Sequence, residues 1–347
     1  MSKVSPARNA AFSILKTMEK HGHSDTLLRA RKVEALSAAD RNLTTALVLG
    51  VLRWQVELDN LIRPLLKHPN AKLDADVLIA LRIGAFQLLH MDRIPARAAI
   101  DESVELTKQA GHRFASGMVN AVLRKLAASR PDASSEPDPN HCKAGFPSWM
   151  VDRWIQNYGE DATCSICRSG QQQPHLSVRL TSDAVQQELT ADGIELAPGE
   201  LLTASRRLIA GDVTRTAAFR GTGTLGRNPE IRHRLRPEDL PRQAERQIAI
   251  LASALRAARP GGYVLYSTCS LEPEENEQVI AAVLFGHPEA NLVSLATRIE
   301  ELQSQGILVP GASQRLLACI QRDGALRLLP GLFQTDGFFA ALIQKQP

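Results

Sequence analysis

The stretch from Arg259 to Glu277, RPGGYVLYSTCSLEPEENE, constrains the fold of this chain more than any other segment. Two glycines end a preceding helix, and residues 263–266 favour a buried strand. Cys269 follows at the carboxyl end of that strand. Residues 272–277 are typical of the acidic first turn of a helix, in which Pro273 suits an early position. Ligands and reacting groups gather at such strand-to-helix corners of open α/β sheets, so we expect Cys269 to lie at a crevice.

The run STCSLEPEENE at 267–277 resembles the nucleophile motif of the Nop/Sun family of S-adenosylmethionine-dependent RNA cytosine-C5 methyltransferases. Two further stretches are similar to the family: GTGTLGRNPEIR at 221–232, and RLLPG at 327–331 with DGFFA at 336–340. The resemblance implies 16S rRNA as the substrate and S-adenosylmethionine as the methyl donor. It also implies that the thiolate of Cys269 adds to C6 of cytosine, which makes C5 nucleophilic toward the methyl group. The alternative for Cys269 is a small buried hydrophobic residue at a strand end.

Composition places the chain among ordinary globular proteins. It has 347 residues, of which 44% are hydrophobic and 22% charged. No segment approaches the roughly 18 uncharged apolar residues that a membrane helix needs. The first twenty residues predict a charged amphipathic helix and lack the apolar core of a signal peptide. We therefore expect a cytoplasmic protein without a membrane partner.

Charge is unevenly distributed along the chain. Residues 1–128 contain 19 Lys and Arg against 12 Asp and Glu, a net charge of +7, whereas the whole chain has +4. A basic N-terminal region suggests an anionic partner, with nucleic acid the first candidate. The alternative is a basic face that is merely solvated.

Residues 1–128 are predicted to form a bundle of about six helices. Helix-start signals include Ser37, three residues before an aspartate, and Asp74 or Asp76 ahead of a long apolar run. Phrases such as ALRIGAFQLLHMDRIP are similar to the NusB-like fold, and this resemblance implies RNA binding. Candidate phosphate contacts are Arg8, Arg53 and Arg124, with ordinary surface arginines as the alternative.

Residues 129–146 are rich in Pro, Ser and Asp and predict a linker. Residues 147–219 then resemble the small RRM-like subdomain of the family, and this resemblance implies RNA binding. Its expected elements are an amphipathic helix at 147–158, a strand at 176–180, a helix at 182–193, a turn at LAPGEL (196–201) and a strand at 205–211.

Residues 220–347 resemble the C-terminal part of a class I methyltransferase domain that lacks its cofactor-binding half. In the family, the phrases that Arg220 and Gly221 join here are separated by on the order of a hundred residues. That segment carries the glycine-rich cofactor loop, most of the Rossmann-like sheet and a second cysteine. The run GTGTLG fits the pattern GxGxxG, but no buried strand precedes it, so it does not predict a cofactor cradle. Arg227 and Asn228, in the loop after this run, are further candidate RNA contacts. We expect S-adenosylmethionine to be the family's cofactor and do not expect this chain alone to bind it or to transfer methyl groups.

The remaining expectations concern the C-terminal elements and the cysteines. Helices are predicted at 242–259 and 275–284, and an antiparallel pair of strands at 325–329 and 338–344. The five cysteines are odd in number and scattered, which argues against a disulfide framework. Cys164 and Cys167 have no second ligand pair at zinc-finger spacing and are expected to line one helix face, so we expect no metal.

Together these patterns and the resemblance predict a multidomain α plus α/β monomer. It would contain an all-helical NusB-like bundle, an RRM-like α+β subdomain and a truncated Rossmann-like methyltransferase domain. Two other functions remain open at this stage. One is a non-catalytic RNA-binding protein, and the other is a NusB-like transcription adaptor that binds protein partners.

Overall fold

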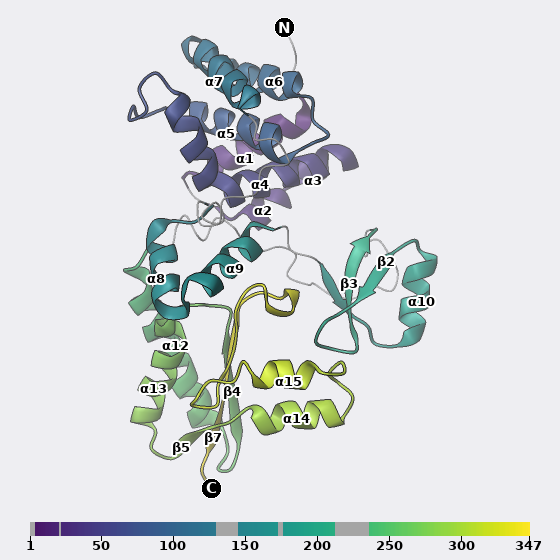
Figure 1. The fold of residues 1–347 in the computed structure, drawn as a ribbon, viewed down its shortest axis with the longest axis vertical. Helices are drawn as coiled ribbons and strands as arrows, with labels where there is room; N and C mark the ends of the chain where they lie inside the picture. Colours follow the sequence, from purple (N-terminus) through teal and green to yellow (C-terminus); the bar gives the residue numbers. More distant parts are fainter. Residues whose placement is uncertain (1–3, 21, 130–144, 173–175, 212–235) are drawn as a thin grey trace. The chain divides into compact units, whose positions relative to one another are not determined.

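Figure 1 shows the computed structural model of the chain, which describes residues 4–20, 22–129, 145–172, 176–211 and 236–347. A helical N-terminal region, a small α+β subdomain and a C-terminal sheet with helices follow one another along the sequence, as predicted. The described residues separate into two compact units, of which the first ends at Gln171. Nearly all of the predicted linker at 129–146 lies outside the described residues, as do Arg227 and Asn228. Among the helices that are described, none is both long and apolar enough to cross a membrane.

The first unit begins with the predicted helical bundle. Its elements are α1 (Pro6–Met18), α2 (Ser24–Leu28), α3 (Arg31–Glu34), α4 (Ala38–Ile62), η1 (Arg63–Leu65), α5 (Ala75–His90), α6 (Ala96–Gln109), η2 (Arg113–Ala115) and α7 (Ser116–Ala128). Both predicted helix starts are confirmed. The side chain of Ser37 accepts the N–H of Asp40, and that of Asp74 accepts the N–H of Asp76, so each satisfies an amide that the first turn leaves without a partner.

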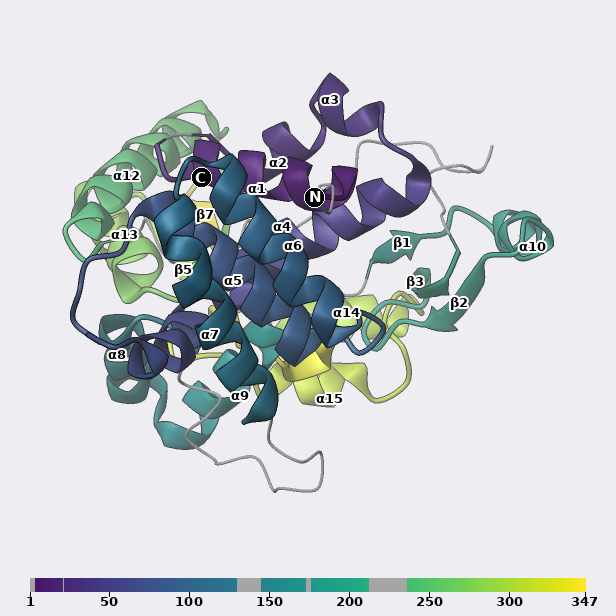
Figure 2. The same ribbon diagram turned by 90° about the horizontal axis from the view of Figure 1, so that it is seen from above.

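Helix α5 is the centre of this bundle, because it contacts α1, α4, α6 and α7 (Figure 2). Its apolar residues are buried on nearly every side, as expected of a helix that other helices surround. Close packing against α4 depends on a glycine: a Cβ atom at Gly50 would lie 2.0 Å from Cζ of Phe86. The bundle therefore has a continuous core of its own.

Two more helices, α8 (Ser148–Tyr158) and α9 (Glu160–Gln171), complete the first unit. Phe146 and Trp154 pack edge to face with ring centroids 5.3 Å apart. Cys164 and Cys167 both lie on α9, and Cys167 is buried. The CxxC pair therefore lies on a helix, as the sequence predicted.

The α+β subdomain of the second unit contains β1 (Ser177–Arg179), α10 (Asp183–Ala191), β2 (Glu195–Pro198) and β3 (Ser205–Ala210), with the antiparallel strand order β1-β3-β2. The predicted turn at LAPGEL is wrong in its first half, because Leu196 pairs with Leu208 and Pro198 with Arg206. Strand β2 lies at the edge of the sheet, where a proline's missing N–H costs no ladder hydrogen bond.

The second sheet belongs to the C-terminal region. Its strands are β4 (Tyr263–Thr268), β5 (Ala290–Val293), β6 (Leu326–Leu328) and β7 (Phe338–Lys345), and its helical segments are α12 (Asp239–Ala257), η5 (Pro273–Glu275), α13 (Glu277–Gly286), α14 (Ala296–Ser304), α15 (Ala312–Leu317) and η6 (Leu332–Gln334). Strand β7 pairs with β4, β5 and β6, and every pairing is antiparallel. The predicted antiparallel pair of terminal strands is confirmed as β6 and β7.

The two faces of β4 differ in burial. Val264 and Tyr266 pack with Leu251 and Leu255 of α12 and with the apolar residues of α13, which form one core. On the opposite face, Tyr263 is 59% exposed and Leu265 62% exposed. The predicted burial of this strand therefore holds for one face and is wrong for the other. Within the described residues β4 pairs only with β7, so no further strand covers its other edge.

Candidate active site around Cys269

Cys269 follows the last residue of β4, and its side chain is exposed. Strand β4 reaches this point because six consecutive residues pair with β7, ending with Thr268 opposite Phe339. The position at the strand's carboxyl end is the predicted one. An exposed thiol can meet a partner from solution, as a nucleophile must, whereas a buried one is usually inert.

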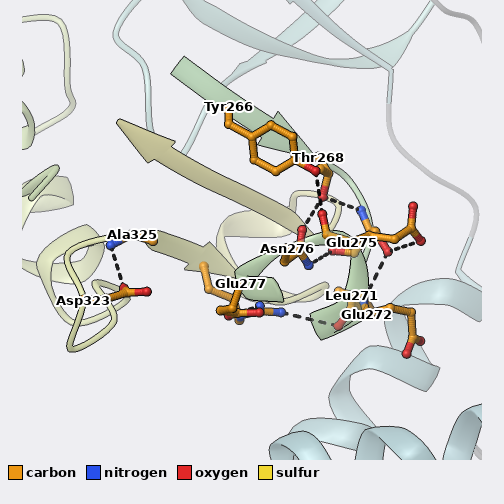
Figure 3. A network of polar contacts seen from close by, with 11 residues as sticks. Tyr266, Thr268, Leu271, Glu272, Glu275, Asn276, Glu277, Asp323 and Ala325 are labelled. Atoms are coloured by element: carbon orange, nitrogen blue, oxygen red, sulfur yellow. Dashed lines mark hydrogen bonds and ion pairs between the residues drawn. The ribbon is translucent and has the colours of Figure 1, made fainter. Parts of the chain in front are cut away.

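The segment after β4 is tied down by its own polar side chains (Figure 3). The hydroxyl of Thr268 donates to Oδ1 of Asn276 at 2.6 Å and accepts the N–H of Ser270 at 3.1 Å. The hydroxyl of Ser270 donates to Oε1 of Glu275 at 2.8 Å and accepts the N–H of Glu272 at 3.2 Å. These bonds close the backbone on both sides of Cys269 into one turn.

The outer side of the turn is supported by α12 and β4. Oε2 of Glu275 accepts Nε2 of Gln247 at 2.7 Å, and the backbone oxygen of Glu275 accepts the phenol of Tyr266 at 2.6 Å. Burial, and then the negative charge of Glu275, raise the pKa of Tyr266 to about 12. The phenol therefore stays protonated, and remains a donor, throughout the physiological pH range.

Arg327 of β6 supports the turn from the other side. Its guanidinium is buried, pairs with Glu277 at the start of α13, and donates to the backbone oxygen of Leu271 at 3.4 Å. It also lies over the ring of Phe339, 5.3 Å from the centroid. A second close contact involves Gly337, where a Cβ atom would lie 2.6 Å from Cδ2 of Leu271. The DGFF segment therefore packs directly against the turn.

The predicted start of the helix at 272–277 is wrong. Residues Pro273–Glu275 form a 3-10 turn, and Asn276 has φ −121° and ψ −98°, which interrupts the helical path. Helix α13 begins only at Glu277. The helix therefore starts later along the chain than Glu272, although Asn276, directly before it, hydrogen-bonds both neighbours of Cys269.

The candidate RNA contacts of the bundle occupy different environments. Arg8 is buried: its guanidinium donates to Glu102 at 2.9 Å, to Gln87 at 2.7 Å and to the Ser5 hydroxyl at 3.0 Å. These internal bonds use the donors that a phosphate would need, so the structure gives Arg8 a structural role, contrary to our expectation. Arg124 is exposed on α7, where its Nε donates to Asn120 at 3.1 Å, and Arg53 is half-buried on α4.

One cluster in the described residues has the composition of a cation site. Single ligand atoms of Asp74, Asp76 and His112 lie within 4.8 Å of one another. However, the ammonium of Lys16 lies 2.6 Å from Oδ2 of Asp76, and Oδ1 of Asp74 already accepts an amide of α5. The cluster is therefore a group of ion pairs between helices, in which the ammonium of Lys16 already takes the place of a bound cation.

The described residues do not fit an S-adenosylmethionine cradle. Such a cradle needs a parallel strand that leads through a glycine-rich turn into a helix. Every strand pair described in the second unit is antiparallel, and the exposed face and free edge of β4 lie where further strands would have to pack. The GTGTLG run falls outside the described residues.

Sequence reasoning named Cys269 but gave no role to three residues that hold its turn: Asn276, Arg327 and Tyr266. Asn276 and Arg327 lie within the motifs singled out above, so their positions were visible. Their contacts were not, because the Arg327 bond joins residues 56 positions apart in the chain. Nothing in a single sequence indicates such a distant contact.

The fold and the site together define a methyltransferase-type domain preceded by a helical bundle and a small α+β subdomain. Models of three families match successive parts of the chain: the NusB family at residues 5–128, the ferredoxin-like domain of RsmF/B-like methyltransferases at 146–210, and the 16S rRNA methyltransferase RsmB/F at 216–344. The chain therefore combines a NusB-family domain with domains of the RsmB/F methyltransferases, which confirms the resemblance.

Individual relatives agree with this assignment. The chain is 28% identical to the ribosomal RNA small subunit methyltransferase B of Thermus thermophilus over 361 residues, covering 81% of this chain and 88% of the relative. It is 23% identical to the enzyme of the same name from Escherichia coli over 454 residues, covering all of both chains. The crystal structure of PH0851 superposes with a TM-score of 0.69 at 20% identity, covering 99% of this chain and 100% of that one, and so shares its fold.

The Escherichia coli alignment contains more positions than this chain has residues. It spans 454 residues end to end, whereas this chain contributes 347, so at least 107 aligned positions have no residue here.

Proposed function

We propose that this protein engages 16S rRNA as a member of the RsmB/F family, and that Cys269 is the nucleophile that adds to C6 of a target cytosine. The observation that carries the proposal is the exposed thiol at the end of β4, held in a turn built entirely from the STCSLEPEEN motif. Family membership supports small-subunit rRNA as the substrate class. Such a substrate would place the protein in the cytoplasm, where we infer that it works as a monomer.

The chemistry assigned to the chain's own residues is limited to this addition. The thiolate forms an S–C6 bond, the electron pair of the C5=C6 bond moves to C5, and C5 can then take up an electrophile or a proton. The RsmB/F family is generally S-adenosylmethionine dependent. Because the described residues do not form a donor cradle, we propose no methyl-transfer step for this chain on its own.

Covalent capture tests the nucleophile. In 5-azacytosine, N5 replaces C5, so thiolate addition to C6 moves the electron pair to N5, which takes a proton from water. The full chain is incubated with a small-subunit rRNA transcript that contains 5-azacytosine, and the products are separated on a denaturing gel. We expect a protein–RNA adduct with the wild type and none with Cys269→Ser. Equal adduct from both proteins, or none from either, would contradict the proposal.

A second candidate function, non-catalytic RNA binding, is favoured because the described residues form no cradle for the methyl donor. It predicts retention of small-subunit rRNA with an affinity that falls steeply as salt rises, because counterions are released from the phosphates. It also predicts that methyl-labelled S-adenosylmethionine leaves no label on the RNA. Labelled rRNA would instead show that the chain is a complete enzyme.

A further inference from the structure

We propose that Asn276 is a positioning residue for Cys269 and that its side-chain amide fixes the backbone on both sides of the thiol. The inference rests on the proposed function, because it concerns how the nucleophile of that reaction is held. Nothing in the comparisons gives Asn276 a role.

The side chain of Asn276 connects the two residues on either side of Cys269. Oδ1 of Asn276 accepts the hydroxyl of Thr268, the residue before the cysteine, at 2.6 Å. Nδ2 donates to the backbone oxygen of Ser270, the residue after it, at 2.9 Å (Figure 3). A carbonyl oxygen can only accept, so the amide can be oriented in only one way, with its NH₂ group toward Ser270. Only a side chain with both a donor and an acceptor can make the two bonds.

The position of Asn276 in the chain makes this use of the amide unusual. It is the residue directly before α13, where an asparagine side chain ordinarily accepts an amide of the first helical turn. Here no such capping bond forms, and the side chain turns back to the cysteine's neighbours. Asn276 is fully buried, whereas Cys269 is exposed. The polar group is thus placed where an unmade hydrogen bond would be costly, and the thiol is presented outward.

Thr268 completes the arrangement, because its hydroxyl serves two partners. It donates to Asn276 and accepts the N–H of Ser270 at 3.1 Å, which closes the turn whose middle residue is Cys269. Removal of either Thr268 Oγ1 or the Asn276 amide therefore breaks the same unit. Two substitutions within one such unit should not act independently.

The experiment compares two reactions of the same thiol. Iodoacetamide needs only an accessible thiolate: sulfur attacks its CH₂ carbon, an S–C bond forms and iodide leaves. Addition to 5-azacytosine in a small-subunit rRNA transcript also needs the sulfur to be correctly placed. We expect Asn276→Ala and Thr268→Val to slow RNA adduct formation at least tenfold, while alkylation of Cys269, mapped by mass spectrometry, changes less than threefold. Loss of placement affects only the reaction that requires it.

Matched variants provide the controls. Thr268→Ser keeps the hydroxyl and should retain adduct formation within threefold of the wild type, whereas the isosteric Thr268→Val loses it. The double variant Thr268→Val/Asn276→Ala should be no slower than the slower single variant. Because Thr268→Val preserves volume, it tests the proposal even if Asn276→Ala fails to fold.

Other results would overturn the inference. The positioning role would be ruled out if Thr268→Ser and Thr268→Val formed the RNA adduct at equal rates. It would also be ruled out if the effects of the two single variants multiplied in the double variant, or if alkylation and adduct formation were lost equally. If the wild type itself forms no adduct, the proposed nucleophile fails, and the role of Asn276 falls with it. That outcome is distinct from a normal wild type with unaffected variants.

Discussion

At the scale of single residues, the ion pair between buried Arg8 and partly buried Glu102 shows how one contact decides a role. An arginine near the start of a basic region suggests a phosphate contact, yet this guanidinium lies 2.9 Å from the Glu102 carboxylate and is almost fully enclosed. Removing the guanidinium would leave the partly buried Glu102 carboxylate without its cation and the buried Oε1 of Gln87 without its donor.

We therefore expect Arg8→Ala to lower the free energy of unfolding of the bundle by about 3–5 kcal/mol. Urea unfolding followed by tryptophan fluorescence measures the change. Arg124→Ala is the matched control, and because Arg124 is exposed it should change stability by no more than about 0.5 kcal/mol. If Arg124 contacts a phosphate, the same variant should reduce the salt dependence of rRNA binding by about one charge. A stable Arg8→Ala protein with weakened rRNA binding would contradict the structural role.

Tyr266 gives a prediction that depends on pH. Its pKa is raised to about 12 from 10.0 because burial and the negative charge of Glu275 disfavour the phenolate. Between these two values the unfolded chain releases this proton and the folded chain keeps it, so this contribution to stability is full below pH 10 and is lost as the pH rises toward 12. Absorbance titration at alkaline pH should show one of the three tyrosines ionising late. Tyr266→Phe should remove that late phase, and its persistence would assign it to another tyrosine.

At the scale of elements, strand β4 carries the site, and its two faces should respond differently to substitution. Ile343, which pairs with Val264 on the covered face, is fully buried, and Ile343→Ala should cost about 2–5 kcal/mol. Leu265→Lys, on the exposed face, should change stability by no more than about 0.5 kcal/mol. Calorimetric unfolding of the full chain measures both. A similar loss from the two variants would mean that the Leu265 face is covered in solution.

The same variant tests the free edge of β4. An uncharged, apolar edge strand is a template for pairing with other chains, and a lysine is a common natural protection. Leu265→Lys should therefore reduce light scattering by concentrated protein relative to the wild type. Leu265→Thr keeps the preference for a strand without the charge and is the control. Equal scattering from all three proteins would show that this edge does not drive association.

Elements with strong local signals could be predicted from sequence, and elements defined by distant partners could not. The helix starts at Ser37 and Asp74 depend on amides two or three residues away, and both are confirmed. Strand β2 was mistaken for a turn because Pro198 and the following glycine are local turn signals, whereas its pairing with β3 is a tertiary feature. The exposure of β4 likewise depends on which strands are present elsewhere. For the site, the motif predicted Cys269 but not the bonds of Asn276 and Arg327.

At the scale of the whole molecule, the chain combines complete modules with an incomplete one. The NusB-type bundle has its own core, and the ferredoxin-like subdomain has its own three-stranded sheet. The C-terminal sheet keeps the nucleophile turn, yet at least 107 positions of the Escherichia coli relative have no counterpart in the chain. Under the proposed function, recognition of RNA and presentation of the thiol are therefore separate from binding of the methyl donor.

This separation makes a thermodynamic prediction. A ligand that binds only the folded state at about a hundred times its Kd raises the free energy of unfolding by about 2.7 kcal/mol, which would raise the unfolding temperature by several degrees. Millimolar S-adenosylmethionine should leave the unfolding temperature of this chain unchanged, and calorimetry should detect no heat of binding. The Escherichia coli relative, measured beside it, is the control in which a shift is expected. If the unfolding temperature of this chain instead rises with ligand concentration, its residues form a pocket for the methyl donor. Methyl transfer after the addition of Cys269 would then be possible for this chain.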